Sequence, residues 1–284
     1  MKRADPDTEL KMAYAETPHG KLYYEIIDQV VPWTTHCETI MFHHGIGADP
    51  GIWTDWLPLL TDRYRIVRFD MRGYGRSHIP PADFKWTIDL LAQDLLAVAD
   101  AAGVGRAHFV GESIGGTVVL QFAITHPERV ATLTVSNGAH VGGSIQGVQA
   151  WQRTIDEQGI NAWSDQFMRD RFVDGALDES KYAWYARRQE SWQRDSILNA
   201  LRALVGADLR PRLSTVTCPV LLMHGDRSPF IPVETLVDLY RCLSNSRLQI
   251  FPNARHGLPF SHARVCAQAV REFLAEARGS QSNT

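Results

Sequence analysis

Gly111-Glu112-Ser113-Ile114-Gly115-Gly116 lies between a short apolar run at 107–110 and a longer helical pattern at 117–125. A G-x-S-x-G sequence is a specific signal when it has this context of strand, sharp turn and helix. We expect the turn to force Ser113 into a strained backbone conformation that lifts its hydroxyl clear of the sheet, with glycines where a side chain would collide. The stretch predicts a nucleophilic serine. Similar glycine and serine clusters also occur in ordinary loops, so the rest of the chain has to supply the partners.

Size and composition favour a globular enzyme that acts on small molecules. The chain has 284 residues, of which 44% are apolar, enough for one large α/β domain. Its formal net charge is −3 and its basic residues are scattered, so we expect no nucleic-acid partner and no membrane partner. Composition leaves open whether the protein forms a homo-oligomer. The N-terminus has no apolar h-region and no segment approaches the roughly 18 apolar residues of a membrane span, which favours the cytoplasm.

Cysteine and histidine spacing gives no sign of a metal site. The four cysteines lie far apart, without a C-x-x-C pair, and are predicted to be reduced thiols: Cys37, Cys218, Cys242 and Cys266. His43 and His44 are adjacent, but no third ligand with suitable spacing lies nearby. We therefore predict neither a metal nor a cofactor.

A glycine-rich turn follows the buried-type strand at 39–42. Its sequence is His43-His44-Gly45-Ile46-Gly47. Such a turn exposes backbone N–H groups that the sheet cannot satisfy and that can point at a developing oxyanion. We predict that the N–H groups of Ile46 and Ile114 form an oxyanion hole. His44 and Gly45 are candidate substrate-binding residues, and a hydrogen-bonded scaffold role is the simpler alternative for His44.

Strand-type and helix-type segments alternate along most of the chain. Strands are predicted at 11–16, 21–28, 39–42, 64–69, 107–110, 130–135, 219–223 and 247–251. Between them, 139–208 is helical, polar and rich in tryptophan. An insertion between two parallel strands lies at their carboxyl ends, so 139–208 is predicted to be a helical cap over a core of 1–138 and 209–284. His140 and Trp151 are its candidate substrate contacts.

The candidate acid and base follow the last two strands. Asp226 lies in the loop after the strand at 219–223, and His256 lies in the loop after the strand at 247–251. The resulting order of Ser, Asp and His is that of α/β-hydrolases. The chain resembles this superfamily in four motifs: the elbow around Ser113, the His-Gly-Ile-Gly turn with Trp53 downstream, the turn Phe69-Asp70-Met71-Arg72-Gly73-Tyr74-Gly75-Arg76-Ser77, and Arg255-His256-Gly257.

Within the superfamily, the segment Ala207-Asp208-Leu209-Arg210-Pro211-Arg212-Leu213 leading to Cys218-Pro219-Val220 resembles the 3-oxoadipate enol-lactonase group of cofactor-free hydrolases. The resemblance implies a mostly parallel central sheet flanked by helices, with the cap inserted after the sixth strand. It also implies hydrolysis of a small carboxylic ester or lactone through an acyl-enzyme, with Ser113 as nucleophile, His256 as base and an acid. Two alternatives stay open: a carbon–carbon bond hydrolase of ring-cleavage products, whose cap arginine would grip a carboxylate, and a ligand receptor with little turnover.

The acid is where the chain departs from the family pattern. In most relatives an aspartate lies three residues after the glycine that ends the strand, and Ser228 occupies that position here. No Asp or Glu is present at 136–150, where some hydrolases place the acid. Asp226 is therefore the predicted acid. Glu234, or Ser228 bonded to the histidine with no acid at all, are the alternatives.

Overall fold

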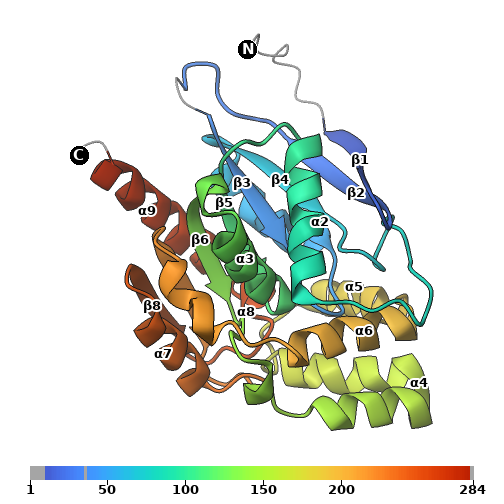
Figure 1. Ribbon diagram of the computed structural model, residues 1–284. Coiled ribbons are helices and arrows are strands. Elements are labelled where there is room, and N and C mark those ends of the chain that lie inside the picture. Colours follow the sequence, from blue (N-terminus) through green and yellow to red (C-terminus); the bar gives the residue numbers. More distant parts are fainter. Residues whose placement is uncertain (1–9, 35–36, 282–284) are drawn as a thin grey trace.

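A single mixed sheet forms the centre of the protein (Figure 1). The computed structural model describes residues 10–34 and 37–281. Within them the strand order is β1-β2-β4-β3-β5-β6-β7-β8. The first two strands, β1 (Lys11–Thr17) and β2 (Gly20–Ile27), form an antiparallel hairpin, and β2 also pairs antiparallel with β4 (Tyr64–Phe69). This confirms the strands predicted at 11–16 and 21–28.

All other strand pairings are parallel. Each strand in this part of the sheet pairs with the next one in the series β4, β3 (Glu38–His43), β5 (Ala107–Glu112), β6 (Val130–Ser136), β7 (Val220–Gly225) and β8 (Ser246–Phe251). Strands β5 and β7 are buried along their whole length, as is typical of parallel strands that are covered on both faces. Because the carboxyl ends of parallel strands share one edge of a sheet, the loops that follow β3, β5, β6, β7 and β8 converge there.

Helices cover both faces of the sheet. On one face, α2 (Ile88–Ala101), α3 (Ile114–Thr125) and α7 (Val233–Cys242) pack into one apolar cluster, and on the other α9 (Ala263–Gln281) packs into a second cluster with η1 (Pro50–Trp56). Thr87 caps α2, because its hydroxyl accepts the Leu90 N–H at 3.1 Å. The short helical segments are α1 (Leu57–Leu60), η2 (Pro127–Arg129), η3 (Gly142–Ser144), η4 (Arg210–Thr215) and α8 (Leu258–Ser261).

Three further helices lie between β6 and β7 in the chain, beyond the sheet edge to which the nucleophile turn leads (Figure 1). They are α4 (Val148–Arg171), α5 (Glu179–Glu190) and α6 (Arg194–Val205). Helix α4 is kinked at Gly159, whose φ is 85°. The helices predicted after the sixth strand are confirmed, whereas their role as a cap and the limits 139 and 208 remain a prediction.

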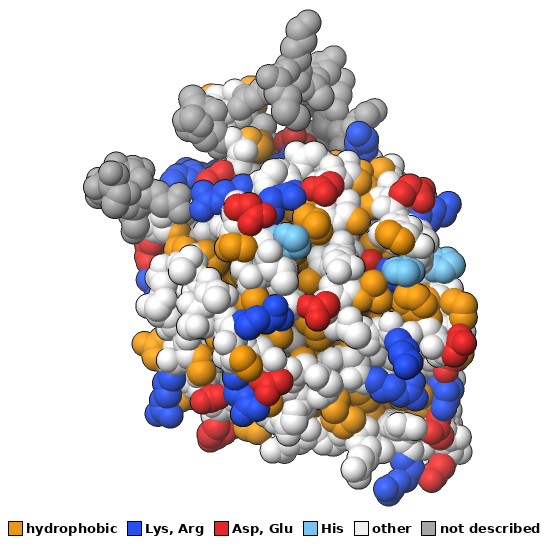
Figure 2. All heavy atoms as spheres, viewed as in Figure 1, with side chains coloured by type: hydrophobic (Ala, Val, Ile, Leu, Met, Phe, Trp, Pro, Cys, Tyr) orange, Lys and Arg blue, Asp and Glu red, His pale blue; other side chains and the backbone are white. Residues whose placement is uncertain are grey.

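Charges of both signs are interspersed on the face shown in Figure 2, without a broad area of one sign. Across the described ranges 10–34 and 37–281, no helix has the length and apolar character needed to cross a membrane.

Candidate active site

Ser113 stands at the junction of β5 and α3 in the strained conformation that the sequence predicts. Its φ is 57° and its ψ is −122°. Glycine is required on both sides because the neighbours are backbone atoms: a Cβ on Gly111 would lie 2.6 Å from the Gly116 nitrogen, and one on Gly115 would lie 2.9 Å from the His43 carbonyl carbon. Such distances cannot be relieved by a side-chain rotation. The packing therefore enforces the turn that presents the serine.

The predicted nucleophile and base are hydrogen-bonded. Ser113 Oγ lies 3.0 Å from His256 Nε2. Asn137, directly after β6, fixes the histidine loop: its Nδ2 donates to the His256 carbonyl at 2.8 Å, and its Oδ1 accepts the Gly225 N–H at 3.1 Å. The sequence did not single out Asn137, although a polar residue that follows a buried strand at the catalytic edge is a signal that could have done so.

The environment of His256 keeps its imidazole neutral. The residue is only 2% exposed. Burial holds its pKa well below the usual value, and the charges of Arg171 and His224 act in the same direction. A neutral imidazole is the form that accepts the proton of a serine hydroxyl.

The structure does not bring the predicted acid to the histidine. Nδ1 of His256 lies 3.3 Å from Ser228 Oγ. Asp226 is exposed, and its carboxylate accepts the Ala254 N–H at 3.1 Å. The Asp226 N–H still bonds to the Phe251 carbonyl at 3.1 Å and so continues the pairing of β7 with β8. This strand-like placement directs its side chain to the loop backbone. Glu234 is an exposed residue in the first turn of α7.

The glycine-rich turn after β3 packs directly on the nucleophile. A Cβ on Gly45 would lie 2.9 Å from Ser113 Cβ and would overlap the Glu112 carboxylate. Gly45 therefore lines the reacting centre as backbone. Ile114 opens α3, so no preceding helical carbonyl is available to its N–H. These positions fit the predicted oxyanion hole of Ile46 and Ile114, which remains a prediction.

His44 is held by the backbone of two turns, as its predicted scaffold role requires, and its role as a substrate contact stays a prediction. Its Nε2 accepts the Met71 N–H at 3.0 Å, and its Nδ1 lies 2.9 Å from the Gly45 carbonyl. Both ring nitrogens are thus engaged by the backbone. Burial lowers the pKa of His44 to about 4, so the ring is neutral. The simpler of the two roles weighed for this residue is the one that the structure supports.

The other two predicted substrate contacts, His140 and Trp151, lie in different surroundings. His140 lies 2.9 Å through Nε2 from the Asp238 carboxylate on α7, so its ring is engaged at the base of the cap and the predicted contact is not supported. Trp151 packs edge-to-face on Phe230 at 5.1 Å between ring centroids, and Phe230 in turn packs on His256 at 5.1 Å. Trp151 is therefore separated from the base by one ring.

Arg171 is the cap arginine that reaches the catalytic edge. It ends α4 and is 1% exposed. Its guanidinium donates to the Ile46 carbonyl at 2.9 Å, lies 3.4 Å from the Glu112 carboxylate and donates to the Tyr185 hydroxyl. Its own carbonyl accepts the Gly257 N–H at 2.8 Å. One residue thus ties the cap to the glycine-rich turn, the elbow and the histidine loop.

Glu112 is the other buried charge beside the nucleophile. It is 1% exposed, and burial raises its pKa to about 7 although Arg171 opposes the shift. A carboxyl group at the end of a fully buried strand requires a cation or a proton. The glutamate inside the elbow was therefore a sequence signal for an arginine, although it could not identify which of the cap arginines is the partner.

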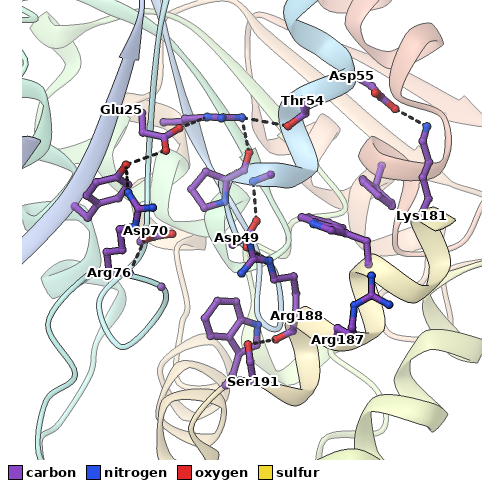
Figure 3. A pocket seen from close by; sticks show the side chains of 18 of the residues that line it. Glu25, Asp49, Thr54, Asp55, Asp70, Arg76, Lys181, Arg187, Arg188 and Ser191 are labelled. Carbon is purple, nitrogen blue, oxygen red and sulfur yellow. Dashed lines mark hydrogen bonds and ion pairs between the residues drawn. The ribbon is translucent and has the colours of Figure 1, made fainter. Parts of the chain in front are cut away.

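A cleft lies between α5, η1, β2 and β4 (Figure 3). It has a volume of about 930 Å³, and Ser113 is not among its lining residues. Lys181 and Arg188 extend from one face of α5 toward η1. Lys181 pairs with Asp55 of η1, and Arg188 pairs at 3.0 Å with Asp49, the N-cap residue of η1. Ser113 is only 5% exposed, so the nucleophile is buried.

A strained serine after a central parallel strand, bonded to a histidine after the last strand, defines a hydrolase of the α/β class. Residues 38–263 match the alpha/beta hydrolase fold family, to which this chain belongs. It is 30% identical to 2-hydroxymuconate semialdehyde hydrolase of Pseudomonas sp. strain CF600, over 84% of this chain and 87% of the relative. It is 27% identical to 3-oxoadipate enol-lactonase 2 of Acinetobacter baylyi, over 79% and 86%. The crystal structure of the enol-lactonase from Burkholderia xenovorans LB400 superposes with a TM-score of 0.82 at 23% identity, over 93% of this chain and all of that one.

Proposed function

We propose that this protein is a serine hydrolase that cleaves a small carboxylic ester or lactone through an acyl-enzyme. The observation that carries the proposal is the 3.0 Å contact of Ser113 Oγ with His256 Nε2 at the strained elbow. A serine hydroxyl is a weak nucleophile until a base accepts its proton, and this contact supplies the base. The similarity to enol-lactonases supports an ester-type bond as the substrate.

The reaction follows from these positions. His256 Nε2 takes the proton as Ser113 Oγ bonds to the carbonyl carbon, and the carbonyl oxygen becomes an oxyanion held by the N–H groups of Ile46 and Ile114. The carbon–oxygen bond to the leaving group then breaks while Nε2 returns the proton to that oxygen. A water molecule repeats the sequence on the acyl-enzyme, which releases the acid and restores Ser113.

A second candidate is hydrolysis of a carbon–carbon bond in a ring-cleavage product. The observation that favours it is Arg171, the cap arginine whose guanidinium is buried within reach of the elbow and the glycine-rich turn. A guanidinium in such a position suits a substrate carboxylate. The similarity to 2-hydroxymuconate semialdehyde hydrolase is in keeping with this candidate.

Turnover of three substrate types separates the two candidates. We would compare kcat/KM for p-nitrophenyl acetate, a five-membered enol lactone and a 2-hydroxy-6-oxo-dienoate, with Ser113→Ala as the control for each. The proposal predicts that the ester and the lactone are the faster substrates. Faster cleavage of the dienoate than of the ester and the lactone, lost in Ser113→Ala, would establish the second candidate. Equal turnover by wild type and Ser113→Ala on all three would overturn both.

A further inference from the structure

The inner nitrogen of the catalytic histidine faces a hydroxyl group. His256 Nδ1 lies 3.3 Å from Ser228 Oγ, and the same oxygen accepts the Ile231 N–H at 3.4 Å. With Nε2 accepting from Ser113, the ring must carry its proton on Nδ1 and donate it to Ser228. Ser228 therefore sets both the tautomer and the plane of the ring.

Among the residues that the structure describes, the charged groups around His256 include no carboxylate placed to stabilise an imidazolium. Arg171 approaches from α4 and His224 from β7, and both disfavour a positive ring. Glu112, from β5, pairs with Arg171, and Asp226 is engaged by the Ala254 N–H. The Phe230 ring packs against the His256 ring at 5.1 Å between centroids, with the two ring planes nearly perpendicular. Within the described residues, the hydrogen bonds of the His256 ring go to two serine hydroxyls.

We infer that Ser228 is a positioning residue that replaces the acid of the triad, and that the uncharged Ser113, His256 and Ser228 relay restricts the enzyme to acyl substrates with acidic leaving groups. This inference rests on the proposed function. The hydroxyl supplies the orientation that a carboxylate would give, without the negative charge.

The missing charge determines which substrates react well. Each attack moves the Ser113 proton to His256 Nε2, which leaves a buried imidazolium without a counter-ion, so the proton transfer is more costly than beside a carboxylate. An ester of a phenol or an enol has a more electrophilic carbonyl, and its leaving oxygen departs without full protonation. An alkyl ester needs both proton transfers to be efficient. The site should therefore prefer aryl esters and enol lactones to alkyl esters.

The rate at which a fluorophosphonate labels Ser113 tests the role of Ser228 without knowledge of the substrate. In this reaction the serine oxygen bonds to phosphorus, fluoride leaves and His256 takes the proton. We would measure the second-order rate from pH 5 to 9 for wild type, Ser228→Ala, Ser228→Thr and Ser228→Asp. The expected rate falls about 10-fold or more in Ser228→Ala, is retained in Ser228→Thr, and rises about 5-fold or more in Ser228→Asp, given the size of orienting effects in serine hydrolases.

The pH profile provides a readout that a merely structural role would not change. Because the carboxylate of Ser228→Asp stabilises the imidazolium, the acid limb of its profile should move to higher pH. Asp226→Asn, on the same loop, is the matched control and should leave rate and profile unchanged. If Ser228→Ala is labelled at the wild-type rate, the inference is overturned while the proposed function stands. Absence of Ser113 labelling in wild type would overturn the proposed function, and the inference with it.

The leaving-group preference is tested on acetate esters of p-nitrophenol, phenol and ethanol. The ratio of kcat/KM between the nitrophenyl and ethyl esters should be steep in wild type and about 10-fold smaller in Ser228→Asp, because a stronger base depends less on an activated substrate. An unchanged ratio in Ser228→Asp would contradict the restriction to acidic leaving groups. If Ser228→Asp does not fold, the ratio should instead become steeper in Ser228→Ala than in Ser228→Thr, and equal ratios would contradict the inference.

Discussion

The elbow at 111–116 and the loop at 225–231 follow two parallel strands of the same sheet, yet they depend on the sequence in opposite ways. At the elbow, Cβ atoms on Gly111 and Gly115 would meet backbone, so one residue type alone fits. In the loop after β7, the partner of His256 is whichever side chain reaches Nδ1, and that is Ser228 and not Asp226. A turn fixed by backbone packing can be recognised in a sequence, whereas the reach of one side chain cannot.

The largest expected effect tests the elbow. Ser113→Ala should lower turnover by at least about 10³-fold, because only binding and the oxyanion hole remain. A fluorophosphonate should add mass to the peptide with Ser113 and to no other peptide, which mass spectrometry detects. Ser191→Ala, exposed at the end of α5, is the control and should behave as wild type. Labelling that survives in Ser113→Ala would remove the nucleophile from the elbow.

The glycine packing gives the next effect. Gly115→Ala should destabilise the fold by about 1–3 kcal/mol and abolish labelling, since overpacking against backbone has to displace the turn. Gly143→Ala is the matched control: no atom lies within 4 Å of its Cβ position. We expect it to stay within about 0.5 kcal/mol of wild type. Urea unfolding of both variants would check this, and equal stability would mean that the elbow is less constrained than its contacts indicate.

Arg171 tests the connection between the cap and the elbow. Arg171→Met leaves Glu112 buried without its cation, so the loss of stability should reach about 3 kcal/mol where the carboxyl is ionised. Burial raises the pKa of Glu112 to about 7, so the folded state binds a proton that the unfolded state releases above about pH 4.3. Stability should therefore fall as pH rises, and more steeply in Arg171→Met than in wild type.

Urea unfolding at pH 6 and pH 8 measures this slope. Arg169→Met, which removes an exposed arginine from the same helix, is the control and should show the slope of wild type. An Arg171→Met protein as stable as wild type at pH 8 would show that the pair does not hold the cap to the elbow.

The smallest effect concerns the loop after β7. Asp226→Asn should change kcat by less than about twofold, because the carboxylate is exposed and bonded to a backbone N–H. Glu234→Gln should be equally silent. A loss of 10²-fold or more in Asp226→Asn would show that the loop rearranges during turnover and delivers the aspartate to His256.

Local patterns determined much of the fold. Strand-type runs of four to eight residues located the strands, and the loss of such runs after β6 located the helical insertion. Glycine, serine and histidine at strand ends located Ser113 and His256. The glycines were recognisable because the neighbouring backbone leaves no room for a side chain. A sequence carries such information within a few residues.

Tertiary structure alone decided the partners. Asn137 holds His256 from 119 residues away, and Arg171 holds Ile46 from 125 residues away. The sequence offered several cap arginines, and only the fold shows that Arg171 is the one buried beside the elbow. The fold likewise pairs His140 with Asp238 on α7. Ser228 reached the histidine and Asp226 did not, because hydrogen bonds depend on side-chain direction to within an ångström. Periodicity along a chain gives the face on which a residue lies, and only the packed sheet and cap determine which side chain it meets.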